Sequence, residues 1–381
     1  MTWEEFNYSQ LEVKKAGRVL RGEDISGMTE EVALKILDNW RAIHSYPLQV
    51  FYVRLRTTSK KLDPSSLTAQ RLKRASSIIA KLQRRYYGRN PSMELTQMQD
   101  IAGCRAILSS VTLARRFVEE EYIKKKGDLK HKLVGMKDYI TSPKPDGYRS
   151  IHLIYSYKSD KKNKKKYDGL LVEIQIRSKL QHIWATAVET VDFFTRQAMK
   201  SNEGQPDWLE FFRLVSSAFA KIEDCPAVPD TPSVDKELYS QILQKERKLN
   251  VTNKIRGWTR AMKIFDERLR KKGANLFLLE LDILGEKLTI HSYTRKEEGK
   301  ALKEYAALEK RYSSSKEYDV VLAGVNAEHD LKKAYPNYFV DTSEFLRQLG
   351  KIIRIANSIE AVGLGQGGFR HENGGGAAES E

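Results

Sequence analysis

Several features are scarce in this chain of 381 residues, and each absence excludes a class of protein. It has two cysteines, Cys104 and Cys225, which cannot make a disulfide framework and do not have zinc-ligand spacing. No run of about 18 apolar residues occurs, which argues against a membrane-spanning helix. The first five residues lack the basic and apolar regions of a secretory leader. We therefore expect a cytoplasmic protein without zinc and without a membrane partner.

Acidic residues are outnumbered, because 50 Asp and Glu stand against 66 Lys and Arg and leave a net charge of +16. Such an excess favours a polyanionic partner through attraction and counterion release. The basic residues gather in clusters, although any one cluster alone is more often a solvated surface. The candidate contacts with such a polyanion are Arg84, Arg85, Lys124, Lys125, Lys126, Lys161, Lys162, Lys164 and Lys165.

Prolines are few and are concentrated at one place. Pro226, Pro229 and Pro232 lie close together, where they prevent a helix and favour an extended linker. The chain is therefore expected to divide into a first domain over 1–225, a linker over 226–235 and a second domain over 236–360. A glycine-rich tail over 361–381 is expected to be disordered.

Apolar spacing predicts helices over most of residues 1–60, with a break at Ser45-Tyr46-Pro47. Residues 50–55 could form either a strand or a turn of helix. Further along, the pattern predicts these elements: a helix that opens at Arg71 and runs to Leu82, a strand over 101–108, an antiparallel hairpin of 151–157 with 170–176, a long charged helix over 235–272, and strands over 276–281, 288–292 and 319–323.

Two carboxylates stand out chemically. Asp100 lies just before an apolar strand that contains Arg105, and Glu173 lies in a second strand that ends near Arg177. A lone acid in a strand is more often an edge or turn residue, but two such acids could converge on one Mg²⁺. The basic residues that follow Arg71 could hold phosphates at a helix opening, or could be a solvated helix face. Together these residues suit Mg²⁺-dependent phosphoryl transfer.

Four segments, in this order, resemble the RelA/SpoT nucleotidyl pyrophosphokinase domain over roughly residues 45–200. They are Arg71 to Leu82, Asp100 to Arg105, Asp138-Tyr139-Ile140 with Lys144 to His152, and Glu173 to Arg177. The resemblance implies an α+β fold with a mixed β-sheet flanked by helices, followed by a small C-terminal α/β regulatory domain. No His-Asp pair of the family's hydrolase domain is evident, which indicates a synthetase-only member.

The resemblance also implies a reaction and its residues. The β,γ-pyrophosphate of ATP, the co-substrate, would pass to a ribose 3′-hydroxyl with release of AMP. Asp100 would bind Mg²⁺, and Glu173 would bind Mg²⁺ or act as the base. Arg74 and Arg105 would clamp the adenine, and Tyr148 would stack on the acceptor base. The ATP-binding set is Arg71, Lys73, Arg74, Ser77, Lys81 and Arg105, and the acceptor-binding set is Lys144, Gly147, Tyr148, His152, Gln175 and Arg177.

The resemblance leaves the acceptor open. Ordinary members modify GDP or GTP to make ppGpp and pppGpp, whereas toxic relatives modify the 3′-terminal adenosine of tRNA and stop translation. The lysine clusters suit an extended polyanion better than a mononucleotide, so tRNA is the favoured acceptor. A non-catalytic RNA-binding protein on a decayed scaffold is a third hypothesis, which the full set of acids and bases argues against.

The second half is similar to the C-terminal region of CapRel-type fused toxin–antitoxin proteins. The resemblance implies an anti-phage toxin in which a Tyr-x-x-Tyr pair blocks the ATP site until a phage capsid protein binds. Tyr335 and Tyr338 have this spacing, although they could equally be ordinary core residues of a small domain. The sequence does not decide the oligomeric state.

Overall fold

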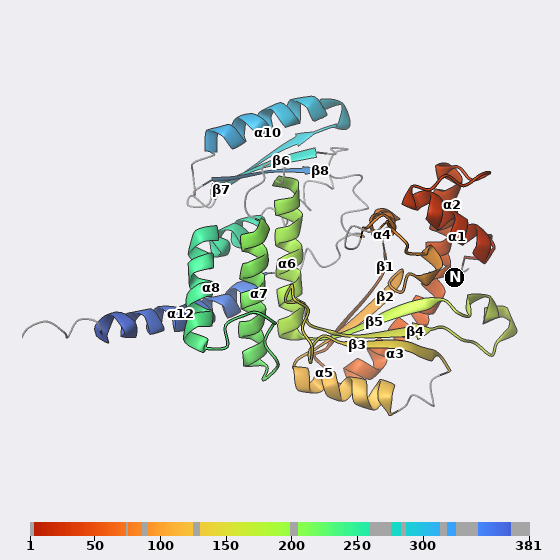
Figure 1. Ribbon diagram of the computed structural model, residues 1–381, viewed down its shortest axis with the longest axis horizontal. Helices are drawn as coiled ribbons and strands as arrows, with labels where there is room; N and C mark the ends of the chain where they lie inside the picture. Colours follow the sequence, from red (N-terminus) through yellow and green to blue (C-terminus); the bar gives the residue numbers. More distant parts are fainter. Residues whose placement is uncertain are drawn as a thin grey trace, which may run out of the picture. The chain divides into compact units, whose positions relative to one another are not determined.

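The computed structural model describes residues 4–73, 75–85, 90–124, 130–198, 205–259, 276–282, 287–312, 318–324 and 342–366. The chain forms two compact units (Figure 1). The first comprises Met1–Lys144, Tyr148–His182 and Glu223–Pro226, and the second comprises Pro145–Gly147, Ile183–Ile222 and Ala227–Glu381. The boundaries expected at 225 and 235 stay a prediction.

The first unit is built on a five-stranded sheet with the strand order β1-β2-β5-β4-β3. The strands are β1 (Leu67–Leu72), β2 (Ala102–Leu108), β3 (Lys132–Asp138), β4 (Ile151–Ser156) and β5 (Leu171–Ser178). The β2–β5 pair is parallel and the other three pairs are antiparallel. The predicted mixed sheet is thus confirmed, and so is the hairpin of β4 with β5.

The two faces of this sheet differ in chemistry because side chains alternate along each strand. In β5, Val172, Ile174 and Ile176 are fully buried, whereas Glu173 and Gln175 between them are partly exposed. The buried face is covered by α3 (Ser45–Leu62) and α5 (Val111–Val118). Phe51 of α3 contacts Tyr155 of β4, and Phe117 of α5 contacts Tyr122, which in turn contacts Tyr155. The polar face is therefore the one available for a site.

The N-terminal helices are α1 (Gln10–Arg21), α2 (Glu30–Ile43) and α3. Ser9 and Glu12 form a capping box that begins α1. The expected break at Ser45-Tyr46-Pro47 is misplaced, because α3 begins at Ser45 and Pro47 lies in its first turn. A proline there sacrifices no helical hydrogen bond, so the helix continues through residues 50–55.

The helix expected from Arg71 to Leu82 is wrong at its start. Residues Leu67–Leu72 pair with β2 along their full length, and α4 begins only at Ala75 and ends at Leu82. Pairing with β2 overrides the good helix propensity of arginine and leucine. Arg71 is therefore a strand residue.

Short helical segments connect the remaining elements of this unit. They are η1 (Leu95–Gln97), a π-helical turn η2 (Glu119–Ile123) that continues α5, and η3 (Lys162–Tyr167), which lies in the connection between β4 and β5. Helix α6 (Lys179–Ala198) follows β5 directly.

The second unit contains a helical part and a small sheet. Helix α8 (Asp235–Leu249) packs against α7 (Gln205–Ile222) and α12 (Ser343–Gln366), and α12 continues past residue 361. The sheet has the order β7-β6-β8, from β6 (Leu276–Asp282), β7 (Lys287–Tyr293) and β8 (Tyr318–Gly324). The short η4 (Arg295–Glu297) leads into α10 (Glu298–Tyr312), which contacts β6 and β8.

The three strands of this sheet agree with the predicted ones. The prediction of one continuous helix over 235–272 is wrong. Asn250 adopts a left-handed conformation with φ of 52° and ends α8, and residues 251–259 form a separate helical segment. Among the described helices, none is both long and apolar enough to cross a membrane.

Candidate active site

Asp100 lies between two lysines. The Asp100 carboxylate accepts from Lys73 Nζ at 3.0 Å and from Lys81 Nζ at 2.8 Å, one lysine on each oxygen. Lys73 follows β1, where its backbone N–H donates to the carbonyl of Ile101 at 2.7 Å, and Lys81 stands on the last turn of α4. The folding of β1 against β2 thus brings one lysine to Asp100, and α4 brings the other.

The pKa of Asp100 is lowered from its ordinary value. Burial raises the pKa, but the charges and hydrogen bonds of Lys73 and Lys81 outweigh burial. Asp100 is therefore ionised at neutral pH and can only accept hydrogen bonds or bind cations.

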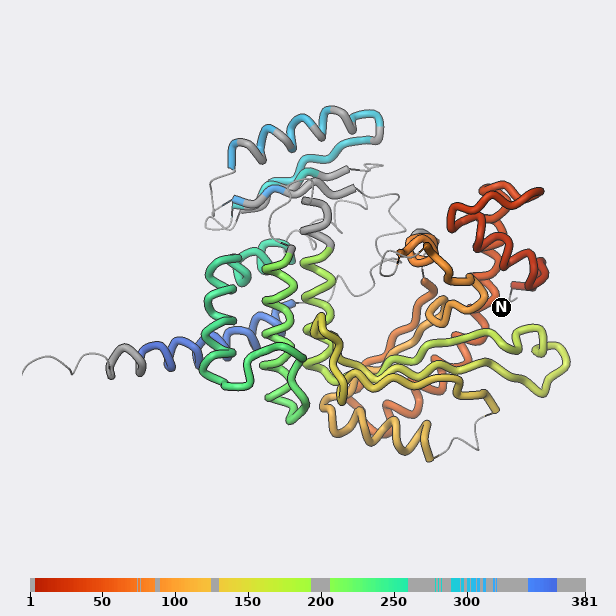
Figure 2. The backbone as a smooth tube through the Cα atoms, viewed as in Figure 1, coloured from red at the N-terminus to blue at the C-terminus, as the bar shows by residue number. Residues whose placement is uncertain are grey.

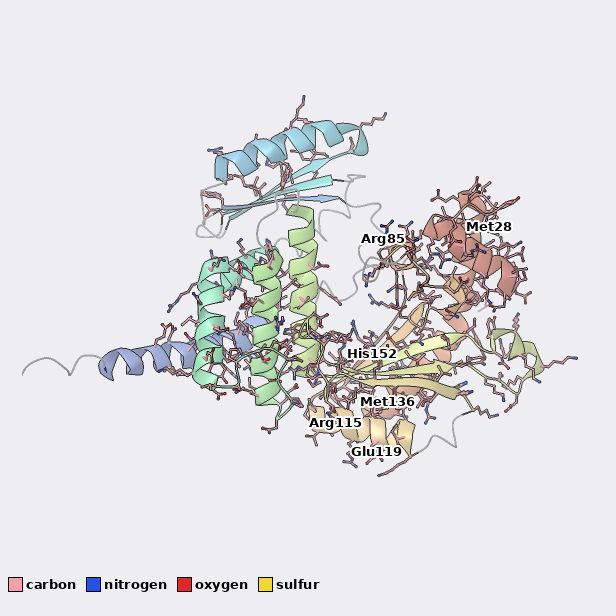
Figure 3. The ribbon with its side chains drawn as sticks, in the orientation of Figure 1. Met28, Arg85, Arg115, Glu119, Met136 and His152 are labelled. Carbon is pink, nitrogen blue, oxygen red and sulfur yellow. The ribbon has the colours of Figure 1, made fainter. Side chains whose placement is uncertain are left out.

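Glu173 is held by two neighbours on the same face of the sheet. His152 Nδ1 lies 2.9 Å from Glu173 Oε1, and Gln175 Nε2 donates to Glu173 Oε2 at 2.7 Å. His152 is opposite Gln175 in the β4–β5 ladder, which explains why both reach the same carboxylate. His152 lies on the sheet (Figure 3).

Tyr148 and Arg177 close these contacts into a ring. Arg177 Nη2 donates to Tyr148 Oη and to Gln175 Oε1, each at 2.7 Å, and Tyr148 Oη lies 2.8 Å from His152 Nε2. Five predicted residues, two from residues 148–152 and three from residues 173–177, thus support one another in one hydrogen-bonded ring.

The pKa of Glu173 is also lowered. Burial raises it, the hydrogen bond and charge of His152 and the hydrogen bond of Gln175 lower it, and the negative charge of Asp100 raises it. The β2–β5 register places Glu173 opposite Gly103, three positions along the chain from Asp100, so both carboxylates belong to the same end of these two strands.

Two neighbouring ionised carboxylates fit a hard cation such as Mg²⁺, which commonly takes one or two carboxylates and completes its shell with water and substrate phosphates. Within the described ranges, no group of three or more His, Cys, Asp or Glu residues forms a complete protein cage.

The arginines of the ATP-binding set are spread over two strands. Arg105 is opposite Gln175 in the parallel ladder and Arg71 is opposite Gly103, so both positions belong to the polar face. Ser77 is exposed on α4, and Arg74 falls outside the described residues.

Two aromatic residues beside the ring were not predicted as site residues. His182 is buried on α6, and its pKa falls to about 3 because of burial and the charges of Arg105 and Arg177. The ring of Tyr139 packs edge-on against His152 at 5.3 Å, with Lys144 Nζ 4.7 Å from its centroid. Tyr139 belongs to the segment Asp138-Tyr139-Ile140, which resembles the RelA/SpoT domain, whereas no local sequence pattern indicates that His182 is a site residue.

Lys144 and Gly147 shape the segment around Tyr148. Lys144 Nζ lies 5.0 Å from the centroid of the Tyr148 ring. Gly147 has a φ of 93°, and a Cβ there would come within 2.9 Å of Trp184 Cζ2. Its carbonyl accepts from Ser216 Oγ at 2.6 Å. Glycine is therefore required both by backbone conformation and by space.

The predicted tRNA contacts are on the surface. The exposed members are Arg84, Arg85, Lys124, Lys161, Lys162 and Lys165, while Lys125 and Lys126 fall outside the described residues. Lys164 is half-buried, with its Nζ 4.3 Å from the centroid of Tyr46. The connection between β4 and β5, which carries Lys161, Lys162, Lys164 and Lys165, projects beyond the sheet (Figure 2). A hydrogen bond from Tyr167 Oη to the carbonyl of Glu4, at 2.9 Å, links this connection to the N-terminal segment. Tyr335 and Tyr338 also lie outside the described residues.

The segment that contains this site is similar to known proteins. Residues 70–193 match the family described as "Region found in RelA / SpoT proteins". The chain is 29% identical to the GTP pyrophosphokinase YwaC of Bacillus subtilis over 160 residues, which are 40% of this chain and 73% of YwaC. It is 33% identical to the GTP pyrophosphokinase YjbM of the same organism over 134 residues, 34% of this chain and 58% of YjbM. The family likeness thus covers the part of the chain that holds both Asp100 and Glu173.

Solved structures are also similar. Small alarmone synthetase 1 from Bacillus subtilis, bound to its product pppGpp, has a TM-score of 0.41 at 23% identity, over 50% of this chain and 94% of that chain. A GTP pyrophosphokinase family protein from Streptococcus pneumoniae has a TM-score of 0.36 at 22% identity, over 47% of this chain and 85% of that chain.

Proposed function

We propose that this protein is a pyrophosphokinase that transfers the β,γ-pyrophosphate of ATP to a ribose 3′-hydroxyl. The observation that carries the proposal is the set of contacts around two carboxylates: Lys73 and Lys81 bind Asp100, and a ring of hydrogen-bonded polar side chains holds Glu173. The match of residues 70–193 and the names of the two relatives support the same reaction class.

In this reaction the acceptor 3′-oxygen attacks the β-phosphorus of ATP and loses its proton to water or to Glu173. The bond between the β-phosphorus and the oxygen that bridges it to the α-phosphorus breaks, and AMP leaves with that oxygen. Mg²⁺, when bound, would neutralise charge on the transferred group. Asp100 and Glu173 would hold the cation, while Lys73 and Lys81 would turn from Asp100 to the phosphates. The lowered pKa of Glu173 makes it a good cation ligand and a weak proton acceptor, so the cation-binding role is better supported than the role of base.

We propose the 3′-end of tRNA as the acceptor. Support comes from the exposed cations of the β4–β5 connection and of the segment after α4, which suit a polyanion longer than one nucleotide. The alternative acceptor is GDP or GTP, which the names of both curated relatives favour. Control of the enzyme by its C-terminal region, with Tyr335 and Tyr338 as the blocking pair and a phage capsid protein as the trigger, is part of the same proposal and rests on the sequence resemblance alone.

The test offers both acceptors to the full chain. The protein is incubated with Mg²⁺ and γ-labelled ATP together with GDP, GTP and bulk tRNA, and the products are separated by size. The Tyr335→Ala/Tyr338→Ala variant is run in parallel, so that self-inhibition cannot hide the activity.

Each product identifies one function. Label in tRNA with release of AMP supports the toxin, and label in a guanine nucleotide makes the protein an alarmone synthetase. RNA binding without AMP release from either form would overturn the enzymatic proposal and would favour the decayed scaffold.

A further inference from the structure

A buried ion pair involves Arg149, the residue that follows Tyr148 in the chain. We call the hydrogen-bonded ring of Tyr148, His152, Glu173, Gln175 and Arg177 the acceptor ring. Arg149 Nη1 lies 3.1 Å from Glu223 Oε2, and the two side chains are 1% and 7% exposed. The partners are 74 positions apart in the chain. Burying two charges costs more solvation than most ion pairs recover, so such a pair is weak evidence of a purely stabilising role.

The Glu223 carboxylate binds more than Arg149. Ser178 Oγ donates to Glu223 Oε1, and Gln181 Nε2 donates to Oε2 at 3.3 Å. Ser178 and Gln181 also form a capping box at the start of α6. The Ser178 N–H donates to Gln181 Oε1 and the Gln181 N–H donates to Ser178 Oγ, each at 3.1 Å. One carboxylate therefore joins Arg149, two positions before β4, to the last residue of β5 and to the first turn of α6.

These contacts fall on residues adjacent to the acceptor ring. Tyr148 precedes Arg149, and Arg177 precedes Ser178. Tyr148 and Arg177 belong to the ring, where Arg177 donates to Tyr148 at 2.7 Å. The residues that follow them, Arg149 and Ser178, both bind the Glu223 carboxylate. Glu223 thus anchors the backbone on both sides of the Tyr148–Arg177 contact.

We propose that Glu223 is a positioning residue for the acceptor subsite, acting through Arg149 and Ser178 on Tyr148 and Arg177. Glu223 touches neither carboxylate of the cation site nor the lysines around Asp100 in the contacts that the structure describes. Its removal should disturb acceptor binding and leave ATP binding intact. This inference rests on the proposed function, which supplies the acceptor.

The experiment compares the full-length wild type with Glu223→Gln, which keeps the size of the side chain but removes the charge that Arg149 needs. The control is Glu210→Gln on α7, the helix that leads to Glu223; it removes a half-exposed carboxylate that pairs with Lys245 of α8. We expect Glu223→Gln to raise the acceptor KM about tenfold or more, as small misplacements of positioning groups do. The KM for ATP should stay within twofold, and Glu210→Gln should match the wild type.

A second readout does not depend on activity. Hydrogen–deuterium exchange of the full chain should rise in peptides that contain Tyr148–Ile151 and Arg177–Gln181 in Glu223→Gln, and should stay unchanged around Asp100. Glu223→Asp, which restores the charge, should recover part of both effects.

The outcomes separate the two proposals. Because the proposed self-inhibition could silence the wild type, the same substitutions are also made in the Tyr335→Ala/Tyr338→Ala background. Absence of AMP release from both backgrounds overturns the proposed function, and the exchange data still decide whether Glu223 anchors these segments. An active wild type with equal changes in both KM values, or with exchange that rises throughout the unit, would show that Glu223 is merely structural and would overturn the inference.

Discussion

At the scale of single residues, the site depends on how neighbours set the charge of two acids. Both Asp100 and Glu173 are partly buried, which alone would favour their neutral forms, yet both have a lowered pKa because cations or donors reach each of them. Both acids therefore keep their negative charge at neutral pH, as the proposed cation site requires.

Asp100→Asn should abolish turnover by removing one cation ligand. We expect AMP release to fall about a thousandfold, a loss typical of a central electrostatic group, while circular dichroism shows an intact fold. Asp38→Asn, which changes an exposed ion pair on α2, is the control and should retain activity. Near-normal turnover in Asp100→Asn would remove this residue from the site.

The same variant has a predictable pH dependence of stability. Because the folded pKa of Asp100 is lowered, its ion pairs stabilise the protein above the ordinary aspartate pKa, and this stabilisation disappears as the pH falls through the folded value. The difference in free energy of unfolding between wild type and Asp100→Asn should therefore shrink toward zero in acid. A difference that stays constant down to about pH 2 would contradict this assignment.

His44 should make the protein sensitive to mild acid. It is buried between α2 and α3, its Nδ1 lies 2.6 Å from the carbonyl of Trp40, and burial lowers its pKa from 6.5 to about 4. The folded state keeps His44 neutral, so its contribution is complete above pH 6.5. Stability is then lost as the pH falls toward 4, because the unfolded chain takes up a proton first.

The loss due to His44 should reach about 2 kcal/mol at pH 5. Urea unfolding at pH 7.5 and pH 5 measures it, and His44→Gln, which can still donate to Trp40, should lose that much less stability over this range. His291→Gln, at an exposed position, should behave as the wild type. Equal acid losses in all three proteins would show that His44 does not carry the effect.

At the scale of elements, the turn before Tyr148 is set by glycine. Gly147→Ala places a Cβ 2.9 Å from Trp184 and 3.1 Å from Ser216 at a positive φ, and should destabilise the protein by about 1–3 kcal/mol. Gly169→Ala is a matched control, because Gly169 has a φ of 89° and open space around its Cβ position. It should cost about 1 kcal/mol from the backbone alone. Equal costs in urea unfolding would mean that packing at Gly147 is unimportant.

The β4–β5 connection provides a test of the acceptor. Replacing Lys161, Lys162 and Lys165 together by glutamine should lower transfer to tRNA at least tenfold. The slope of log affinity against log salt should fall by about 2–3, since each phosphate contact contributes close to one. Transfer to GDP should not change.

The matched control for this triple variant replaces the exposed lysines Lys14, Lys15 and Lys35 of α1 and α2 by glutamine. It removes the same charge away from the connection and should leave transfer to tRNA intact. If both triple variants lowered transfer to tRNA equally, the effect would come from the net charge of the protein and not from a contact surface on the β4–β5 connection.

At the scale of the whole molecule, the proposed control by the C-terminal region predicts that removing the residues after 235 makes the protein toxic to its host. Such a cut also removes α8 and α12 from α7. The ring of Phe345 on α12 lies 5.9 Å from Phe212 and 6.0 Å from Phe219, so the cut exposes apolar surface. Point substitutions are the better test.

Tyr335→Ala/Tyr338→Ala in the full chain should raise AMP release about tenfold or more if the pair blocks the ATP site, a coupling within the usual range for two linked sites. Host growth should slow on expression. Tyr239→Ala, at a tyrosine of α8, is a control for the loss of an aromatic ring. Unchanged AMP release from a folded double variant would contradict self-inhibition.

The sequence by itself determined which residues could do the chemistry. Carboxylates, lysines and the tyrosine segment stand in local motifs, and residue type alone limits what each can bind. Strand alternation also marked the polar and apolar faces of the hairpin, because side-chain direction follows from a period of two.

The tertiary structure alone decided which of these residues meet. Pairing with β2 made Arg71 a strand residue, chain reversal brought His152 and Glu173 together, and folding placed Glu223 behind Arg149. His182 is buried beside Arg105 and Arg177, although no local pattern distinguishes it from a surface histidine. Contacts between residues far apart in the chain depend on the packing of whole elements, which a pattern of neighbouring residues does not encode.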